Sequence, residues 1–331
     1  MIVWANSTTI PGGVGKYLYR RAKRILPPYY IALAAVIGII FLSHGLKQFG
    51  GTGEQDSSWR ENVSLGSIVA HGVLVHNFSP RWYMGIDPPM WSVAVEWQIY
   101  FLLPLILLPL YRRLGLMLAV GACVALSLAP HFLLSSYNLD WCCPWYFGLF
   151  ALAAGAVLNF SEVPSHRRME TRVRWKPLAL TLGGALVVAA ICWPNLITGD
   201  SGFQWLVDLL AGVATVAVIV QCARAARDGE APGLGGRLFS SLPVVLLGEF
   251  SYSLYLVHYP VLQKLQQVLR AHHFSYGQQV AAQWAIGLPA VIGLAYVFHL
   301  MFERPFVSGF RKEADRSFTT ERAGSSSIVA P

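Results

Sequence analysis

WSVAVEWQIYFLLPLILLPL, residues 91–110, is the stretch that decides the fold. It runs for 20 residues and holds a single charged side chain, Glu96. An α-helix rises about 1.5 Å per residue, so a helix of this length crosses the roughly 30 Å hydrocarbon core of a bilayer. Arg112 and Arg113 follow its far end. The stretch is therefore predicted to be a membrane-spanning helix.

Seven other runs have comparable length and apolar content. They are residues 28–46, 114–130, 142–160, 177–193, 204–222, 241–262 and 279–302. Of the 331 residues, 55% are hydrophobic and 13% are charged, and the mean hydropathy is +0.48. This composition excludes an ordinary soluble enzyme and a disordered chain, and the long unbroken runs are not those of a β-barrel. The sequence predicts an all-α, polytopic transmembrane helical bundle with about eight spans.

Basic residues gather at alternate connections between these runs. With the clusters facing the cytoplasm, that side holds twenty Lys and Arg residues and the other side five, a strong positive-inside bias. Topology thus accounts for the formal net charge of +8, and no nucleic-acid partner is expected. The sequence predicts an integral membrane protein with cytoplasmic N- and C-termini.

The apolar stretch at residues 67–78 is not counted as a span. A crossing there would place the basic cluster at residues 167–176 outside the cell, against the charge bias. Residues 67–90 are therefore predicted to form a re-entrant or interfacial segment on the outer face. Trp91 and the prolines at 80, 88 and 89 suit a shaped outer mouth.

The apolar runs and their connections are predicted to form one membrane-embedded domain over residues 1–312. The Ser-rich residues 313–331 are expected to be a disordered cytoplasmic tail. The five cysteines include no C-x-x-C pair and fall mostly within apolar runs, so they are interpreted as core residues. No metal site and no bound cofactor are expected.

Glu96 is the first candidate for chemistry, because an ionisable group inside a span is costly and usually functional. Ser92 precedes it by four residues and Tyr100 follows it by four, so the three side chains share one helix face. A carboxyl group in an apolar setting suits acid–base work. The alternative is a structural hydrogen bond to a neighbouring helix.

His258 is the second candidate, in a span predicted to run from inside to outside. It shares a helix face with Ser251 and Tyr255 and lies near the outer end, at the membrane level predicted for Glu96. A direct catalytic role and a purely hydrogen-bonding role both stay open for it.

Arg20, Arg21 and Arg24 precede the first run and form the third group. Arginine forks suit phosphate groups, including those of coenzyme A. Basic residues at this position also set orientation and contact lipid head groups, and spacing alone favours that second interpretation.

Three stretches together resemble the acyltransferase 3 family of integral-membrane acyltransferases. They are the basic stretch at residues 19–30, the Trp-Ser-x-x-x-Glu-x-x-x-Tyr helix at 91–100, and the closing signature at 247–260 with 302–306. The resemblance implies acyl transfer from coenzyme A, usually acetyl-CoA, to a hydroxyl of an exported or cell-surface carbohydrate. It also implies donor-phosphate contacts for Arg20, Arg21 and Arg24, and a functional carboxylate at Glu96.

The family plan has ten spans, and the first two have no counterpart here. One of them carries an Arg and, after ten residues, a His that is thought to be catalytic. Low or no activity is therefore expected of the chain as given, with Glu96 and His258 as its remaining catalytic candidates. The alternative function is a non-enzymatic membrane protein, such as a transporter of lipid-linked glycans or an accessory subunit.

Overall fold

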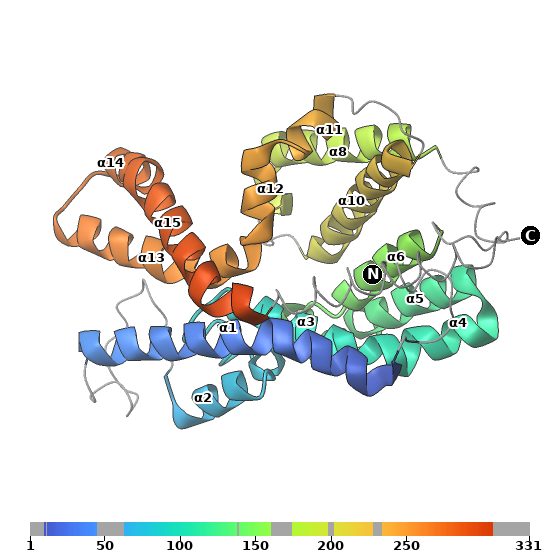
Figure 1. The fold of residues 1–331 in the computed structure, drawn as a ribbon, viewed down its shortest axis with the longest axis horizontal. Helices are drawn as coiled ribbons and strands as arrows, with labels where there is room; N and C mark the ends of the chain where they lie inside the picture. The colour runs from blue at the N-terminus through green and yellow to red at the C-terminus, as the bar shows by residue number, and fades with distance from the viewer. Residues whose placement is uncertain are drawn as a thin grey trace, which may run out of the picture. The chain divides into compact units, whose positions relative to one another are not determined.

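The computed structural model describes residue 10 and residues 12–44, 63–137, 139–159, 174–197, 202–227 and 234–306. These residues form helices and connecting turns and include no β-strand, which confirms the predicted all-α fold (Figure 1). The tail at 313–331 and the part of the basic cluster before residue 174 lie outside the described residues.

The helices have the following bounds along the chain. They are α1 Gly13–His44, α2 Leu65–Gly72, η3 His76–Phe78, α3 Met90–Leu102, η4 Leu103–Leu107, α4 Leu108–Leu114, α5 Leu116–Leu133, η5 Ser135–Tyr137, η6 Asp140–Cys142, α6 Tyr146–Asn159, α8 Trp175–Cys192, α9 Pro194–Ile197, α10 Gln204–Arg227, α11 Leu234–Phe239, α12 Leu242–Glu249, α13 Ser251–Ala271, α14 Tyr276–Ala282, η7 Gln283–Gly287, α15 Leu288–Phe298 and η8 His299–Glu303.

Three of these segments, η4, η7 and η8, are single π-type turns inside longer helices. In η4 the cause is visible in the sequence, because Pro104 lacks the N–H that would continue the α-helical ladder. The helix from Met90 to Leu114 nevertheless continues through this turn. The residues 91–110 are thus one continuous helical rod, as predicted.

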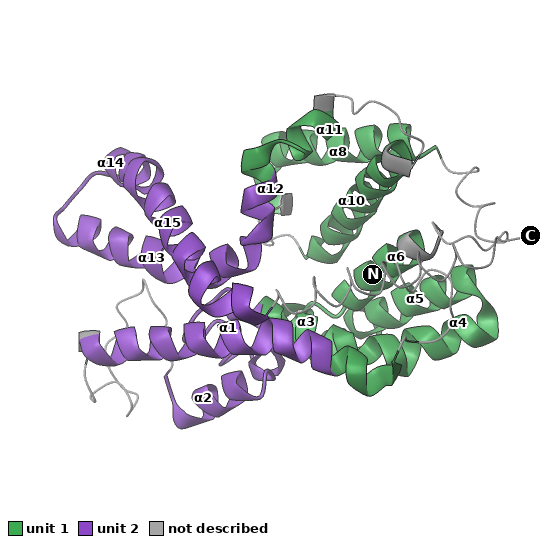
Figure 2. Cartoon of the chain, viewed as in Figure 1, with its two compact units in different colours: residues 1–18, 92–244 green, residues 19–91, 245–331 purple. Residues whose placement is uncertain are grey.

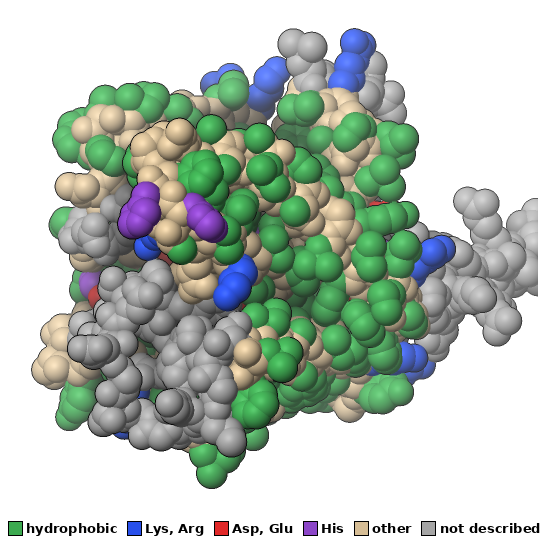
Figure 3. Space-filling view, turned by 90° about the vertical axis from the view of Figure 1, so that its left-hand side faces the viewer, with side chains coloured by type: hydrophobic (Ala, Val, Ile, Leu, Met, Phe, Trp, Pro, Cys, Tyr) green, Lys and Arg blue, Asp and Glu red, His purple; other side chains and the backbone are tan. Residues whose placement is uncertain are grey.

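Six helices in the described part of the chain are long and apolar enough to cross a membrane. They are Gly13–Leu42, Met90–Leu114, Leu116–Leu133, Trp175–Cys192, Gln204–Ala225 and Tyr276–Phe306. The predicted run at 142–160 corresponds to α6, which has 14 residues. The predicted run at 241–262 is interrupted at Phe250, whose non-helical backbone separates α12 from α13. Large apolar side chains cover much of the exterior seen in Figure 3, as expected for a bundle that lies in lipid.

The chain divides into two compact units, each built from two separated stretches (Figure 2). Unit 1 comprises residues 1–18 and 92–244, and unit 2 comprises residues 19–91 and 245–331. In unit 1, α5 packs against α6, and α10 packs against both α6 and α8. A Cβ on Gly148 would lie 2.5 Å from Ser127 Oγ. Glycine is therefore needed at this point for α5 and α6 to approach each other.

Unit 2 is organised around α13, which packs against α15 and the η7 turn. Gln283 Nε2 donates a hydrogen bond of 3.0 Å to the carbonyl of Leu262 across this pair. The short helix α2 is fastened to α1 by two adjacent tyrosines. The hydroxyl of Tyr29 donates to the carbonyl of His71 at 3.0 Å, and that of Tyr30 donates to the carbonyl of Gly72 at 2.7 Å. These bonds satisfy carbonyls at the end of α2 that have no helical partner.

The structure forms residues 65–90 into short pieces and not into a spanning helix. The helix α2 has 8 residues, or about 12 Å of helix, against the roughly 30 Å of a bilayer core. After it come the η3 turn and a run of bends up to Met90. This geometry agrees with the prediction that the segment does not cross the membrane, and its position relative to the bilayer stays a prediction.

Candidate functional site

Glu96 and Tyr100 in unit 1 meet as their spacing predicted. The Tyr100 hydroxyl donates a short hydrogen bond to Glu96 Oε1, one helical turn away. Tyr100 is buried, with its ring edge-on to Tyr17 at 6.2 Å and to Phe150 at 6.4 Å between ring centroids. A buried tyrosine of fixed orientation therefore orients the Glu96 carboxylate.

Glu96 itself is an exposed side chain and not a buried one. The sequence suggested a carboxyl group enclosed by apolar neighbours, but in unit 1 the surrounding side chains leave it open. The side chains at positions 93, 94 and 95 are buried, whereas the side chain of Glu96 is exposed. Exposure makes the carboxylate accessible to a reactant. Ser92, on the same face, is half-buried.

His258 and Tyr255 in unit 2 also lie together, on α13. His258 Nδ1 lies 2.7 Å from the Tyr255 carbonyl oxygen, which can only accept a hydrogen bond. The proton is therefore assigned to Nδ1, and Nε2 of the neutral ring keeps a lone pair. A histidine whose tautomer is fixed in this way is suited to accept a proton at Nε2.

Tyr255 links this helix to the segment that precedes the Trp-Ser motif. Its hydroxyl donates a hydrogen bond of 2.5 Å to the carbonyl of Pro89, 166 residues earlier in the chain. Trp91, two residues further on, is half-buried with its ring edge-on to Tyr83 at 6.4 Å between centroids. Tyr255 thus holds the residues 89–91 against α13.

The three arginines lie within α1, which is one helix from the basic stretch into the apolar run. Arg20 and Arg21 are half-buried and Arg24 is exposed. One residue beyond Arg24, the carbonyl of Ile25 accepts a hydrogen bond of 3.0 Å from the Tyr252 hydroxyl. α13 therefore fastens α1 at the turn that carries the arginines.

A buried cluster in unit 2 was not chosen from the sequence. His71, His76 and Asp87 are all fully buried. The two imidazole rings stack with centroids 3.7 Å apart and planes within 7°, and His71 Nδ1 bonds to the Ser67 carbonyl at 2.8 Å. Both carboxylate oxygens of Asp87 have no hydrogen-bond partner in the described part of the chain. Buried polar atoms without partners are rare and call for a functional or structural reason.

The electrostatics of this cluster follow from burial. Burial raises the pKa of Asp87 to about 7. Burial, with the charge of His71 as the second cause, lowers the pKa of His76 to about 3, and burial also lowers the pKa of His71. Asp87 lies within electrostatic range of Tyr29 and Tyr259. At neutral pH the histidines are therefore uncharged and Asp87 is divided between its two protonation states.

Backbone strain marks the same segment. Ile86, which precedes Asp87, is fully buried and has a φ of 60°. A β-branched residue is seldom found in this left-handed region, and such strain gathers at functional sites. The sequence signal for the cluster was weak, because two histidines five residues apart and a lone aspartate before two prolines form no known motif. Only the fold brings them together.

The closing signature of the sequence forms a polar link inside unit 2. Glu303 is buried and accepts a hydrogen bond of 2.5 Å from Ser253 Oγ and one of 2.9 Å from His299 Nδ1. The link joins α13 to the last helical turn, η8. This arrangement fits a structural role for Glu303, because both of its neighbours are also part of the helix packing.

The predicted site residues thus form two pairs: Glu96 with Tyr100 in unit 1, and His258 with Tyr255 in unit 2. The prediction that Glu96 and His258 meet concerns residues of different units and stays a prediction. The catalytic and donor-binding roles of all the residues singled out from the sequence likewise stay predictions.

An all-helical fold with several membrane-crossing helices and a carboxylate in one of them defines an integral membrane protein with a polar site. Sequence comparison gives the class: the family model described as an acyltransferase domain matches residues 2–300. The chain belongs to this acyltransferase family, as the resemblance implied.

The curated relatives include the O-acetyltransferase OatA of Staphylococcus aureus, from strains NCTC 8325 and COL among others. The match to each is 26% identical over 184 residues and covers 52% of this chain. It covers 29% of the relatives' own length, so most of each relative has no counterpart in the match. No solved structure matches the chain significantly.

Proposed function

We propose that this chain is a membrane O-acyltransferase that moves an acyl group, most simply acetyl, from a coenzyme A thioester to a hydroxyl of an exported or cell-surface carbohydrate. Membership of the acyltransferase family and the similarity to an O-acetyltransferase support this proposal. The observation that carries it is the hydrogen bond from buried Tyr100 to the exposed Glu96 carboxylate, inside an otherwise apolar span.

The reaction needs a base at the acceptor. The acceptor hydroxyl oxygen attacks the thioester carbonyl, its proton passes to the base, and the carbon–sulfur bond breaks to release the thiolate, which is then protonated. The Glu96 carboxylate and His258 Nε2 are the proposed catalytic groups. Tyr100 is a positioning residue, because it acts through Glu96, and Tyr255 acts through His258 in the same way.

The donor is proposed to bind through its phosphates to Arg20, Arg21 and Arg24. One guanidinium group can donate two parallel hydrogen bonds to the oxygens of a phosphate, and these three arginines lie within two turns of one helix. Trp91 and Ser92 are proposed to shape the site around the reacting groups. The charge bias of the sequence supports cytoplasmic termini in a bacterial plasma membrane, with the arginines on the donor side.

The test is the transfer of labelled acetyl from acetyl-CoA to membrane carbohydrate. We expect Glu96→Gln to lower transfer by about 100-fold or more, the usual range for a lost acid–base group. Tyr100→Phe should lower it less, because the carboxylate remains. Tyr276→Phe is the matched control, since Tyr276 is 82% exposed on α14. Wild-type transfer by a folded Glu96→Gln protein would contradict the proposed role.

The expectation of low activity in the chain as given is tested by the same assay. Strong transfer by the chain as given would refute the expectation.

A further inference from the structure

One end of unit 1 carries a cluster of aromatic and carboxylate side chains that the proposed function does not use. The end of α5, the turn η6 and the starts of α6 and α10 meet there. The members of this aromatic–carboxylate cluster are His131, Phe132, Asp140, Trp145, Gln204, Trp205 and Asp208.

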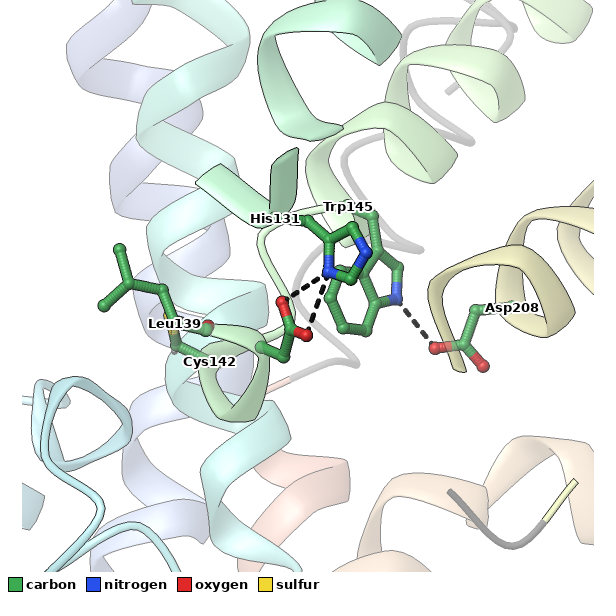
Figure 4. Close-up of polar contacts among 6 residues, drawn as sticks. His131, Leu139, Cys142, Trp145 and Asp208 are labelled. Carbon is green, nitrogen blue, oxygen red and sulfur yellow. Dashed lines mark hydrogen bonds and ion pairs between the residues drawn. The ribbon is translucent and has the colours of Figure 1, made fainter. Parts of the chain in front are cut away.

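Two carboxylates are fixed in the cluster by directional hydrogen bonds (Figure 4). His131 Nδ1 lies 2.9 Å from both oxygens of Asp140. Trp145 Nε1 donates to Asp208 Oδ2 at 2.7 Å, although the two residues are 63 positions apart. Gln204 Nε2 donates to the other oxygen of Asp208 at 2.8 Å. The carboxylates are therefore held in place before any ligand arrives, with lone pairs left to accept further hydrogen bonds.

The rings of the cluster form a partly open wall. The centroid of His131 lies 4.7 Å from that of Phe132 and 5.6 Å from that of Trp205, and Phe132 lies 5.2 Å from Trp205. Trp145 is buried behind them, whereas Phe132 is 57% exposed. The side chains of His131 and Asp140 stay 19% and 37% exposed. Phe132 and the His131–Asp140 pair are therefore partly open to a ligand at the surface.

The cluster lies at the level of Glu96 within unit 1. Glu96 precedes the turn at Gly115 by 19 residues and His131 follows it by 16, and the chain turns back at Gly115 so that α5 packs against α4 and η4. At 1.5 Å per residue, Glu96 is about 28 Å and His131 about 24 Å from that turn along the helices. Arg112 and Arg113 mark the opposite end. The cluster and the proposed catalytic carboxylate are therefore at the same end of unit 1.

We propose that the aromatic–carboxylate cluster of unit 1 binds a neutral carbohydrate, through ring faces that stack on the C–H surface of a sugar and through Asp140 and His131, which bond to its hydroxyls. Carboxylates oriented beside aromatic rings match a ligand that is apolar on one face and rich in hydroxyls at its edge. None of the members carries a fixed positive charge, so an anionic glycan or a phosphate is disfavoured. This inference rests on the proposed function, for which the cluster supplies a binding site for the acceptor.

The alternative is an aromatic belt at the membrane surface, where Trp residues gather without binding a solute. A belt needs rings at the right depth, but it does not need a carboxylate fixed on an indole N–H or a second one fixed on an imidazole. The hydrogen bonds that Asp208 accepts from Trp145 and that Asp140 accepts from His131 therefore favour a binding site.

The test measures binding to the full chain in nanodiscs by saturation-transfer NMR and calorimetry, with chitohexaose and cellohexaose as probes. We expect millimolar or tighter binding of at least one probe by the wild type. Trp205→Ala and Asp140→Asn should each weaken it by at least tenfold. The control is Trp193→Ala, because Trp193 is 64% exposed at the end of α8 and is not a cluster member. Circular dichroism checks that each variant keeps its helical content.

Three outcomes decide the proposal. Weaker binding by both cluster variants, with the Trp193→Ala protein unchanged, supports it. Lack of wild-type binding to both probes overturns it, and so does equal binding by wild type and Trp205→Ala, which would leave the rings as a membrane belt. Carbohydrate binding together with acetyl transfer that stays at the wild-type level in Glu96→Gln would support this site while contradicting the proposed role of Glu96, so the two failures are distinguishable.

Discussion

Replacing Asp87 by Asn should change how the stability of the protein depends on pH. Asp87 is fully buried without a hydrogen-bond partner in the described residues, and burial raises its pKa from 3.8 to about 7. A group whose pKa is raised on folding contributes stability that is present below its unfolded pKa and is lost as the pH rises through its folded pKa. The loss therefore develops between about pH 4 and pH 7.

The magnitude follows from the size of the shift. A shift of about three pKa units at about 1.4 kcal/mol each corresponds to roughly 4 kcal/mol, as an upper limit when the folded state does not relax. Asparagine has the shape of the protonated acid and does not ionise. The stability difference between Asp87→Asn and wild type should thus grow by up to about 4 kcal/mol in favour of the variant from pH 4 to pH 7.

His76 should act with the opposite sign over much of the same range. Its pKa is lowered from 6.5 to about 3, so its contribution to stability is present above pH 6.5 and is lost as the pH falls. In the wild type the two contributions oppose each other. As the pH is lowered, the stability of His76→Gln relative to wild type should therefore rise, whereas the stability of Asp87→Asn relative to wild type should fall.

Thermal midpoints of the full chain in detergent, measured every half pH unit from 4 to 8, provide the assay. The variants must show opposite slopes relative to wild type. A stability difference for Asp87→Asn that does not change with pH would refute the reasoning, since it would mean that the carboxyl group ionises in the folded state as easily as in the unfolded one.

Two further predictions concern helix contacts. Gly148→Ala should destabilise the protein by about 1–3 kcal/mol, because the added methyl group meets Ser127 where α5 contacts α6. Gly183→Ala is the control: its added methyl group meets nothing within 4 Å, so the change should be neutral or stabilising by up to about 1 kcal/mol. Thermal midpoints measure both effects. Tyr255→Phe removes the partly buried bond to the Pro89 carbonyl, so it should lower acetyl transfer and reduce the stability by about 0.5–1.5 kcal/mol, the usual net contribution of one hydrogen bond. Unchanged transfer and an unchanged thermal midpoint would show that this bond does not support the site.

The fold class could be predicted because the length and hydropathy of each apolar run can be measured from consecutive residues alone. A run such as residues 91–110 has to form its backbone hydrogen bonds within itself, and a helix does this. The interruption at Phe250 was not predicted in this way, because α12 and the first half of α13 both contain many apolar residues and read as one run. The sequence therefore predicted that the apolar runs form α-helices, but it predicted the number of helices only approximately.

The site could be predicted only where its parts are close in sequence. Glu96 and Tyr100 are one turn apart, so helical periodicity alone places them together, and the same holds for Tyr255 and His258. The bond from Tyr255 to Pro89 joins residues 166 positions apart, and no local pattern contains it. The exposure of Glu96 was also hidden, because burial depends on which neighbours the fold supplies.

The length of α1 sets how far its three arginines lie from the apolar part of the same helix. Its 32 residues make a rod of about 48 Å, roughly 18 Å longer than the oily interior of a bilayer. That excess equals some twelve residues, and counted from Gly13 it ends at Arg24. With the predicted run at residues 28–46 in the bilayer, the three guanidinium groups would lie beyond the lipid tails, and a donor nucleotide bound there, as proposed, would be held at a height that this helix sets.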